Sequence, residues 1–461
     1  MKKIFTYMTL MAAVILTACS DSEDFALTSG GGSFSYLENK NTISMPLVVH
    51  EENWEGNSGL ESKSSLAYKY QTGRLRFEWQ EGDNVGVYPV KGSGGTPVDP
   101  SASTCIPWKI WSVTTTDDKS VGVFDKDDEH ISPHKDESYI AVAPYILDDT
   151  DYRDIPVKYD GQVQSASAKI GAYMKKATAS EEEKYVASEV EACSHLSKYD
   201  YLVDTERQAT EAGGKMRFEM KRLSSIVRFF MKVPANIVFD NLQLYNPTKE
   251  FTLTTTLNGY TGEYAAEPTT KSHAMSLKLN EFGFDYTTCT ANDDYYYSST
   301  IGWVMVCYMM VAPIDLSETA TEESTLYLIG REPHYYANAT EYNAAWGTNI
   351  DEATFNGMTQ KQKMKVYTTF GAFNTAKGLT GDDALNESEF NELPTALKMS
   401  EWTSKAYSAT LTKKNLEADV LYQWSSAASA EDPITFHEIS IETWKTGTEF
   451  TNTDGEGTDD W

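Results

Sequence analysis

Short stretches in which apolar and polar residues alternate recur along almost the whole chain. In residues 74–79, Leu75, Phe77 and Trp79 share one face and charged residues share the other, as in a half-buried strand. The turn that follows predicts a hairpin with residues 85–88. Further strands are predicted at residues 42–50, 106–113, 120–124, 139–143, 216–221, 226–233, 241–245, 251–257, 275–279, 304–312, 325–329, 365–370, 406–412 and 434–443.

Helical patterns are nearly absent from this series of strands. The best early helix candidate is residues 181–196, where the apolar positions are sparse. Short strands joined by turn residues are typical of sandwiches and barrels, and not of parallel sheets with crossover helices. The sequence therefore predicts an all-β fold of β-sandwich domains.

Changes of composition divide the chain further. The stretch 208–214 is polar and ends in two glycines, so it is the expected boundary between two sandwich domains. Residues 333–363 fit no strand pattern and are expected to be an insertion in the second domain. Five parts are predicted, namely a signal peptide, a flexible tether, two sandwich domains and an acidic mobile tail, and they cover residues 1–18, 19–41, 42–207, 208–446 and 447–461.

The N-terminus has the pattern of an export signal. Lys2 and Lys3 precede an apolar run that ends at Leu16 and is too short to cross a bilayer. The motif Leu16-Thr17-Ala18-Cys19 resembles the lipobox of bacterial lipoproteins, in which the cysteine becomes the first residue and is acylated. An ordinary signal peptide with a chance cysteine is the alternative. The acidic residues 20–24 resemble the surface-export tag of Bacteroidetes-type lipoproteins, which predicts a lipid on Cys19 and a location at the cell surface, in the outer membrane.

Charge excludes some partners. The chain carries 68 acidic and 39 basic residues, a formal net charge of −29. Nucleic acid is not an expected partner, because binding its phosphates requires a basic surface. The same charge repels anionic membranes, so attachment to the outer membrane has to come from the lipid anchor.

The remaining cysteines are spread along the chain without a C-x-x-C pair. We expect mostly buried free thiols, and one disulfide stays open as an alternative in an oxidising compartment. The four residues are Cys105, Cys193, Cys289 and Cys307.

The sequence contains no convincing catalytic constellation. His130 and His134 have helical spacing, but Pro133 between them would break the helix that a zinc site requires. The acidic residues 125–129 lack the glycine of a calcium loop. We therefore expect no catalytic, cofactor-binding or metal-binding residues, and a protein that is not an enzyme.

Six segments, in order, resemble elements of the Bacteroidetes fimbrillin family. The first contains Trp79, Gly82-Asp83 and Val85-Gly86-Val87-Tyr88. The others resemble a strand ending in Pro-Tyr, a loop with glutamines, a Tyr-Asp-Tyr-Leu-Val segment, a strand pair and a later strand ended by proline. They are residues 139–145, 160–164, 199–203, 218–233 and 310–313.

This resemblance implies two tandem transthyretin-like β-sandwich domains, exported as a lipoprotein and used in fimbriae, with other fimbrial subunits as partners. It also implies that a trypsin-like protease can remove the first strand, so that a neighbour's strand takes its place. No arginine precedes Arg74 in this chain, so the cut would have to follow Arg74 or Arg76. Solvent-facing strand charges are the alternative role of these two arginines.

The C-terminal tail bears on the type of subunit. A donor strand needs several alternating apolar side chains, but residues 447–460 contain only Phe450 as a large apolar one. We therefore expect an anchor, tip or accessory subunit that binds a host or bacterial surface protein or glycan. A surface glycan-binding lipoprotein is the alternative, because tyrosines cluster at 295–297 and at 335–336 near Trp346.

Overall fold

The computed structural model describes most of the chain from residue 41 to residue 439. Within the described residues, 335–401 form one compact unit, here called the insert, and the rest form a second unit, here called the sheet unit. The described ranges are 41–44, 50–52, 67–69, 74–76, 79–92, 96–99, 105–113, 121–124, 137–145, 151–164, 193–208, 216–234, 237–279, 284–285, 296–298, 302–316, 323–393, 395–424 and 434–439.

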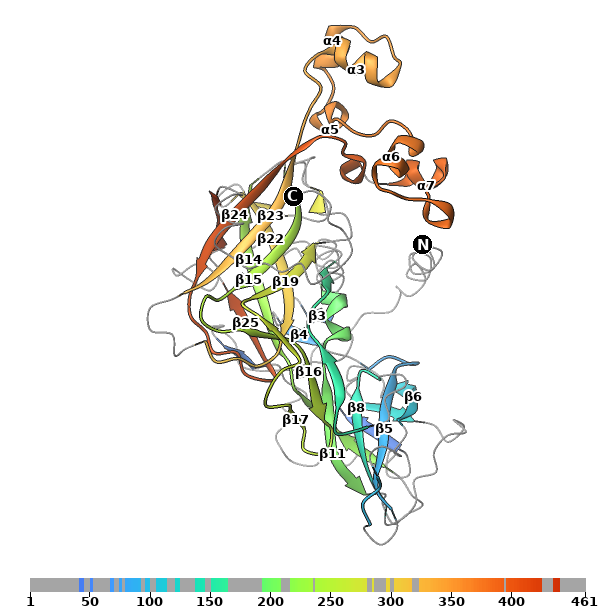
Figure 1. Cartoon of the computed structure of the whole chain (residues 1–461), viewed down its shortest axis with the longest axis vertical. Helices are drawn as coiled ribbons and strands as arrows, with labels where there is room; N and C mark the ends of the chain where they lie inside the picture. Colours follow the sequence, from blue (N-terminus) through green and yellow to red (C-terminus); the bar gives the residue numbers. More distant parts are fainter. Residues whose placement is uncertain are drawn as a thin grey trace, which may run out of the picture. The chain divides into compact units, whose positions relative to one another are not determined.

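The first sheet of the sheet unit has eight strands. They are β1 (Asn41–Ser44), β5 (Asn84–Lys91), β6 (Ile106–Val113), β7 (Val121–Phe124), β8 (Ser138–Ala143), β11 (Leu202–Gln208), β12 (Arg217–Glu219) and β13 (Lys221–Arg222). Their order is β12-β1-β7-β6-β5-β8-β11-β13, and Figure 1 shows β5, β6 and β8 next to one another.

This sheet curls until its two ends meet. β6 pairs with β5 through residues 106–109 and with β7 through residues 110–113, and its register shifts near Ile110, so it crosses a corner. β12 and β13 lie at opposite ends of the order, yet only Met220 separates them in the chain. The curled sheet encloses a core in which the rings of Trp108 and Phe218 meet edge to face at 5.8 Å.

Two further sheets follow, with seven and six strands. The seven-stranded sheet contains β10 (Gln162–Gln164), β15 (Val238–Tyr245), β19 (Ala274–Leu279), β20 (Phe284–Asp285), β23 (Ser324–Pro333), β24 (Trp402–Leu411) and β27 (His437–Ile439). The six-stranded sheet contains β2 (His50–Glu52), β14 (Ser225–Val233), β21 (Tyr296–Ser298), β22 (Gly302–Val311), β25 (Val420–Trp424) and β26 (Ile434–Thr435).

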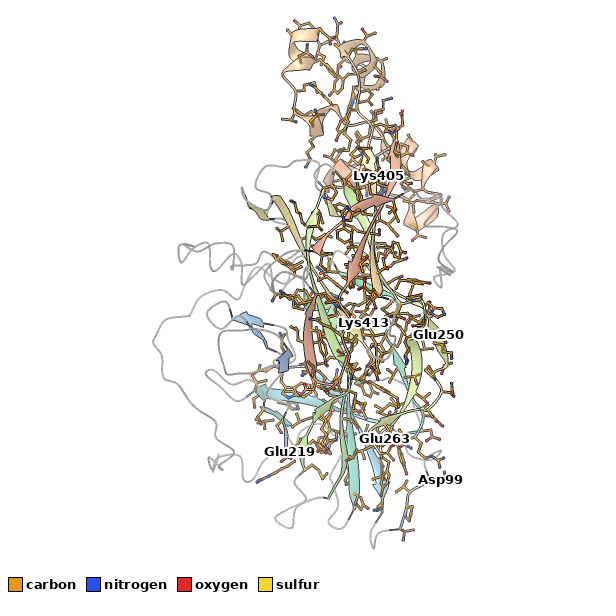
Figure 2. All side chains as sticks on the ribbon, turned by 90° about the vertical axis from the view of Figure 1, so that its left-hand side faces the viewer. Asp99, Glu219, Glu250, Glu263, Lys405 and Lys413 are labelled. Atoms are coloured by element: carbon orange, nitrogen blue, oxygen red, sulfur yellow. The ribbon has the colours of Figure 1, made fainter. Side chains whose placement is uncertain are left out.

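The centre of the six-stranded sheet is buried on both faces. β14 pairs with β22 from Ser225 opposite Val311 to Val233 opposite Trp303. Nearly every residue of β14 is buried, and Phe229 stacks on Trp424 of β25 with ring centroids 5.6 Å apart. This continuous burial explains why both strands are mostly apolar in sequence. Figure 2 shows side chains packed between the strands, with the exposed Glu250 at the margin.

The smaller sheets and a short helix complete the sheet unit. In β16 buried residues alternate with half-buried ones, as expected for a strand with one covered face. A four-stranded sheet holds β9 (Ile155–Lys158), β16 (Phe251–Asn258), β17 (Glu263–Tyr264) and β18 (Thr270–Ser272), a hairpin holds β3 (Ala67–Lys69) and β4 (Arg74–Arg76), and the 3-10 helix η4 covers Ser194–Lys198.

The insert is helical. Its helices are short, and side-chain oxygens of Asn338, Asp351, Thr359, Thr369 and Asn386 accept hydrogen bonds from their first-turn amides. The elements are α3 (Ala339–Trp346), α4 (Glu352–Asn356), α5 (Gln360–Lys363), α6 (Phe370–Ala376), η5 (Gly381–Asp383), α7 (Glu387–Glu392) and η6 (Thr395–Lys398).

The all-β sandwich fold expected from the sequence is confirmed, but several local predictions are wrong. The expected hairpin of residues 74–79 with 85–88 does not form, because β4 pairs with β3 and β5 pairs with β6 and β8. The expected strand 365–370 is instead a loop that leads into α6. Most of the helix candidate 181–196 and most of the boundary 208–214 lie outside the described residues, so the boundary stays a prediction.

Candidate functional site

The N-terminal strand β1 lies inside the eight-stranded sheet. It is antiparallel to β7 on one side and parallel to β12 on the other. The Met220 amide donates to the Ser44 carbonyl at 2.8 Å, and the Ser44 hydroxyl donates to the Phe218 carbonyl at 3.1 Å. A segment from the very start of the described chain therefore occupies a position bonded along both of its backbone edges.

Ile43 anchors β1 in the core. It is fully buried and lies opposite Gly122 of β7. A Cβ atom on Gly122 would lie 2.8 Å from the Ile110 Cδ1 atom and 3.2 Å from the Ile43 Cγ2 atom, so this position has room only for glycine. Without β1, the sheet would contain a slot one strand wide with a pocket for one apolar side chain.

β2 occupies a second, different sheet. It runs parallel to β25, with His50 opposite Val420, at the edge of the six-stranded sheet. β1 and β2, which both lie upstream of Arg74, thus belong to two different sheets. The sequence predicted one strand over residues 42–50, and the structure has two short strands that pair with different partners.

The two predicted processing residues lie in β4. Arg74 is opposite Lys69 and Arg76 is opposite Ala67 in a hairpin of two three-residue strands. A two-stranded ladder of this length is only marginally stable, and a protease needs its substrate in an unpaired, extended form. A cut at either arginine would separate β1 and β2 from the rest of the chain.

The edge of β22 is closed by side chains from β10. The Gln162 amide nitrogen donates to the Met310 carbonyl at 2.6 Å, and its oxygen accepts from the Met310 amide at 2.8 Å. Gln164 donates in the same way to the Val306 carbonyl at 2.9 Å and accepts from the Tyr308 amide at 2.7 Å. Two glutamine side chains thus make the hydrogen bonds that a neighbouring strand would make.

A histidine completes this closure. His195 of η4 is buried, and its Nε2 atom lies 3.0 Å from the Tyr308 carbonyl oxygen. The peptide groups of β22 at Tyr308 and Met310 that do not face β14 are therefore bonded to side chains. An incoming strand finds no open edge along this part of β22.

A buried ionic cluster joins three distant segments. The Arg222 side chain is fully buried and donates to the Asp200 carboxylate at 2.7 and 3.2 Å and to the Asp419 carboxylate at 2.6 Å. Burial raises the pKa of Asp200, and the guanidinium of Arg222 opposes this rise by stabilising the carboxylate. Removing one member would leave a buried charge without its partner, which is strongly destabilising.

A hydroxyl network lies beside the cluster. The Tyr159 hydroxyl is 2.9 Å from the Ser224 hydroxyl and 2.5 Å from that of Tyr264, and Ser224 donates to the Tyr199 carbonyl at 3.0 Å. Burial raises the pKa of Tyr159 well above its usual value. The motif residues around positions 160, 200 and 223 therefore meet in space, where they hold the fold together.

The described residues offer no reactive constellation. No group of three His, Cys, Asp or Glu side chains among them is placed to hold a metal ion. A cavity of about 310 Å³ is lined by residues that include Trp79, Asp83, Ser197 and Asp200. Its polar groups are engaged in the fold, because Asp83 accepts from the Gln80 amide, Ser197 donates to the Ser194 carbonyl and Asp200 pairs with Arg222.

The cysteines that the structure describes are Cys105, Cys193 and Cys307, and all three are buried, as expected. Burial raises the pKa of the Cys307 thiol well above its usual value, so this sulfur is held in its protonated, unreactive form. Cys19 and Cys289 lie outside the described residues. In the part of the chain that is described, no helix has the length and apolar character needed to cross a membrane.

The chain resembles several solved structures at low identity. A candidate cell adhesion protein from Bacteroides ovatus is 11% identical with a TM-score of 0.38, and the match covers 87% of this chain and 96% of that one. A second, from Bacteroides fragilis, is 7% identical with a TM-score of 0.32 and covers 87% and 98%. A fimbrial protein from Bacteroides vulgatus is 13% identical with a TM-score of 0.27 and covers 55% and 78%. No family model and no curated protein matches the chain, and at these values no residue role transfers to it.

Proposed function

We propose that this protein is a cell-surface lipoprotein that serves as a fimbrial subunit of the anchor, tip or accessory type. It works in adhesion or in assembly by strand complementation, and it is not an enzyme. The observation that carries the proposal is β1, a strand from the N-terminal segment that lies between two strands of the first sheet. The resemblance of six sequence segments to fimbrillins supports the same proposal.

The position of β1 suits strand complementation. An incoming strand gains backbone hydrogen bonds from β7 and β12, and its side chains are selected by pockets along the slot. The pocket now filled by Ile43 would require a β-branched or other apolar residue at one position of the incoming strand. The closed edge of β22 directs such pairing away from the central strands of the six-stranded sheet.

The composition of the tail supports the proposed type of subunit. Residues 447–460 contain Phe450 as their one large apolar side chain, whereas a donor strand must fill several pockets in alternation. A subunit that holds an acceptor slot but lacks a donor strand can occupy an end of a fibre and cannot propagate it. The tail therefore favours an anchor, tip or accessory subunit over a stalk subunit.

Cys19 supplies the membrane attachment in this proposal. Several acyl chains on one cysteine anchor a protein stably, whereas a single chain binds a membrane only marginally. The protein then faces outward from the outer membrane, with other fimbrial subunits as its partners.

Protease treatment tests the subunit type. The purified protein, incubated with a trypsin-like protease, is expected to remain monomeric in size-exclusion chromatography and electron microscopy. Ladders of SDS-resistant oligomers after cleavage at Arg74 or Arg76 would make it a stalk subunit instead. Immunogold labelling of intact cells tests the broader role, since label scattered over the cell with none at fibre ends or bases would contradict a place in fimbriae.

A further inference from the structure

The sequence of the insert contains the same pattern twice. Matching residues are 31 positions apart as far as a glycine in the middle of each copy and 35 apart after it, because the second copy has four extra residues there. The matched pairs are Tyr336 and Tyr367, Tyr342 and Phe373, Asn343 and Asn374, Gly347 and Gly378, Asp351 and Asn386, Phe355 and Phe390, Asn356 and Asn391, Lys363 and Lys398, and Met364 and Met399.

The backbone closes each copy in the same way. The Tyr336 amide donates to the Lys363 carbonyl at 2.8 Å, and the Tyr367 amide donates to the Lys398 carbonyl at 2.7 Å. An isolated bridge joins residues 335 and 364 in the first copy and residues 366 and 399 in the second. Gly347 and Gly378 both have φ of 64°, a conformation that favours glycine.

One asparagine side chain in each copy hydrogen-bonds to the loop between the two helices of that copy. The Asn343 side chain donates to the Ile350 carbonyl at 2.8 Å and accepts from the Ile350 amide at 2.9 Å. Asn374 does the same with Leu385, at 2.7 and 3.0 Å. The same pair of hydrogen bonds forms in both copies although the second loop is longer.

The aromatic core also repeats. Tyr336 meets Tyr342 edge to face at 5.4 Å, and Tyr367 meets Phe373 in the same way at 5.8 Å. The next contacts, Tyr342 to Phe355 and Phe373 to Phe390, have interplanar angles of 57° and 56°. Figure 1 shows the two resulting helical hairpins, α3 with α4 and α6 with α7.

A lysine closes each hairpin. The Lys363 ammonium lies 4.9 Å from the Phe355 ring centroid and donates to the Asn356 carbonyl at 3.3 Å. In the second copy the Lys398 ammonium lies 4.7 Å from the Phe390 ring and donates to the Asn391 carbonyl at 3.1 Å. So many equivalent contacts between matched residues mark two copies of one structural unit.

We propose that the insert is a tandem duplication of one helical repeat, and that Trp346 of the first copy forms a carbohydrate-binding platform that the second copy lacks. This names a ligand class for the adhesive role proposed above and rests on that role.

A side chain that the repeat fold requires should occur in both copies, and a side chain found in one copy alone is not required by the fold. Trp346 corresponds to Lys377, and both follow an aromatic residue by one helical turn. The Trp346 ring stacks on Tyr342 at 5.9 Å with an interplanar angle of 24°, and it is 39% exposed. The second copy folds in the same way without this indole, so packing does not account for an exposed tryptophan here.

The surroundings of Trp346 favour a neutral sugar. The negative face of an aromatic ring attracts weakly positive C–H groups, and one face of a sugar ring presents several of them. Gly347, Thr348 and Asn349 follow Trp346, are exposed and carry no charge, so they leave room for hydroxyl groups. Acidic residues outnumber lysines in the insert, which disfavours an anionic ligand.

The platform is tested with matched variants of the full chain. Native gels containing gastric mucin, galactomannan or xyloglucan are expected to retard the wild-type protein in at least one case. Trp346→Ala should weaken that binding by about tenfold or more, while Lys377→Ala, at the equivalent position, should bind as the wild type does. Absence of retardation in all three gels, or equal loss in both variants, would overturn the platform.

The duplication is tested separately by hydrogen exchange. Asn343→Ala should speed exchange of the amides of residues 339–356, and Asn374→Ala should speed exchange of residues 370–392, each by a similar factor. Changes that spread over the whole insert in either variant would refute two separately built copies. The gels use monomeric protein, so a chain that joins fimbriae but binds no glycan refutes the platform and leaves the fimbrial role standing.

Discussion

Gln162 and Gln164 show how single side chains can replace a strand. Each presents an amide whose geometry matches that of a peptide group. Each donates to one backbone C=O of β22 and accepts from one backbone N–H of β22. Buried peptide groups without partners are costly, so these bonds matter more for what they prevent than for their net gain. Both side chains are essentially buried, which removes competition from water.

Truncation of Gln164 tests this role. Gln164→Ala removes the amide that bonds to the buried Tyr308 N–H and to the Val306 C=O, and should lower the free energy of unfolding by about 2–4 kcal/mol. Urea denaturation measures the change. Val163→Ala is the matched control, since Val163 lies between the two glutamines but is 37% exposed, and a change within about 0.5 kcal/mol is expected. Equal effects of the two substitutions would contradict the role of the amide.

Buried tyrosines predict a loss of stability at alkaline pH. Burial, with a smaller contribution from Glu438, raises the pKa of Tyr407 to about 12 from 10.0. The stabilisation is therefore complete below pH 10 and is lost as the pH rises from 10 to about 12, by about 2–3 kcal/mol at most. Tyr407→Phe should flatten the fall in unfolding free energy between pH 9.5 and 11.5, in urea titrations at each pH. Tyr260→Phe, at a 37% exposed ring, is the control, and an unchanged slope in both would refute the assignment.

The glutamine segment could be recognised from the sequence, but its role could not. Residues 160–164 stand out as a motif, yet Gln162 and Gln164 bond to residues 148 and 142 positions away. Periodicity reports only which face of a local element is buried. The same limit applies to Arg222, whose partner Asp419 is 197 positions distant.

At the scale of elements, the N-terminal segment is divided between two sheets. β1 is held on both sides in the eight-stranded sheet, and β2 lies at an edge of the six-stranded one. An edge strand has half the backbone hydrogen bonds of an internal strand, so β2 should detach more readily than β1. Access to the β1 slot therefore depends chiefly on how firmly Ile43 is packed.

Gly122 provides a way to loosen β1. In Gly122→Ala the new Cβ would lie 2.8 Å from Ile110 and 3.2 Å from Ile43, so β1 has to shift. We expect a loss of about 1–3 kcal/mol in unfolding free energy and faster hydrogen exchange of residues 41–44, followed by mass spectrometry. Gly92→Ala meets nothing closer than 3.9 Å and should leave that exchange unchanged. Unaltered exchange in Gly122→Ala would show that β1 is not packed through this contact.

Long strands were predictable because their pattern is local. Residues 106–113 are β6 as expected, and 139–143 lie in a fully buried strand. Short strands such as β9 and β10 were missed, since three or four residues carry too little periodicity. The repeat in the insert also escaped prediction, because the four extra residues of the second copy break the register and aromatic positions alternate between Tyr and Phe.

At the scale of the whole molecule, the insert interrupts one hairpin of the sheet unit. β23 and β24 pair from Ser324 opposite Leu411 to Pro333 opposite Trp402, and the insert joins their ends. Within the insert, Tyr336 contacts Tyr342, which contacts Phe355, and Tyr336, Ala339 and Phe355 form a core cluster separate from the main one. The insert and the sheet unit should therefore contribute independently to stability.

Deletion of the insert tests this independence. Replacing residues 334–401 with a short turn containing Asn-Gly reconnects two strands that already lie side by side. The shortened chain should keep the thermal unfolding transition of the sheet unit within about 4 °C, as measured by calorimetry. Gln164→Ala, which weakens only the sheet unit, should lower that transition equally in the full and shortened chains, because effects at independent sites add. A larger effect in one background would reveal energetic coupling between the two units, and with it a role for the insert in holding the sheets together.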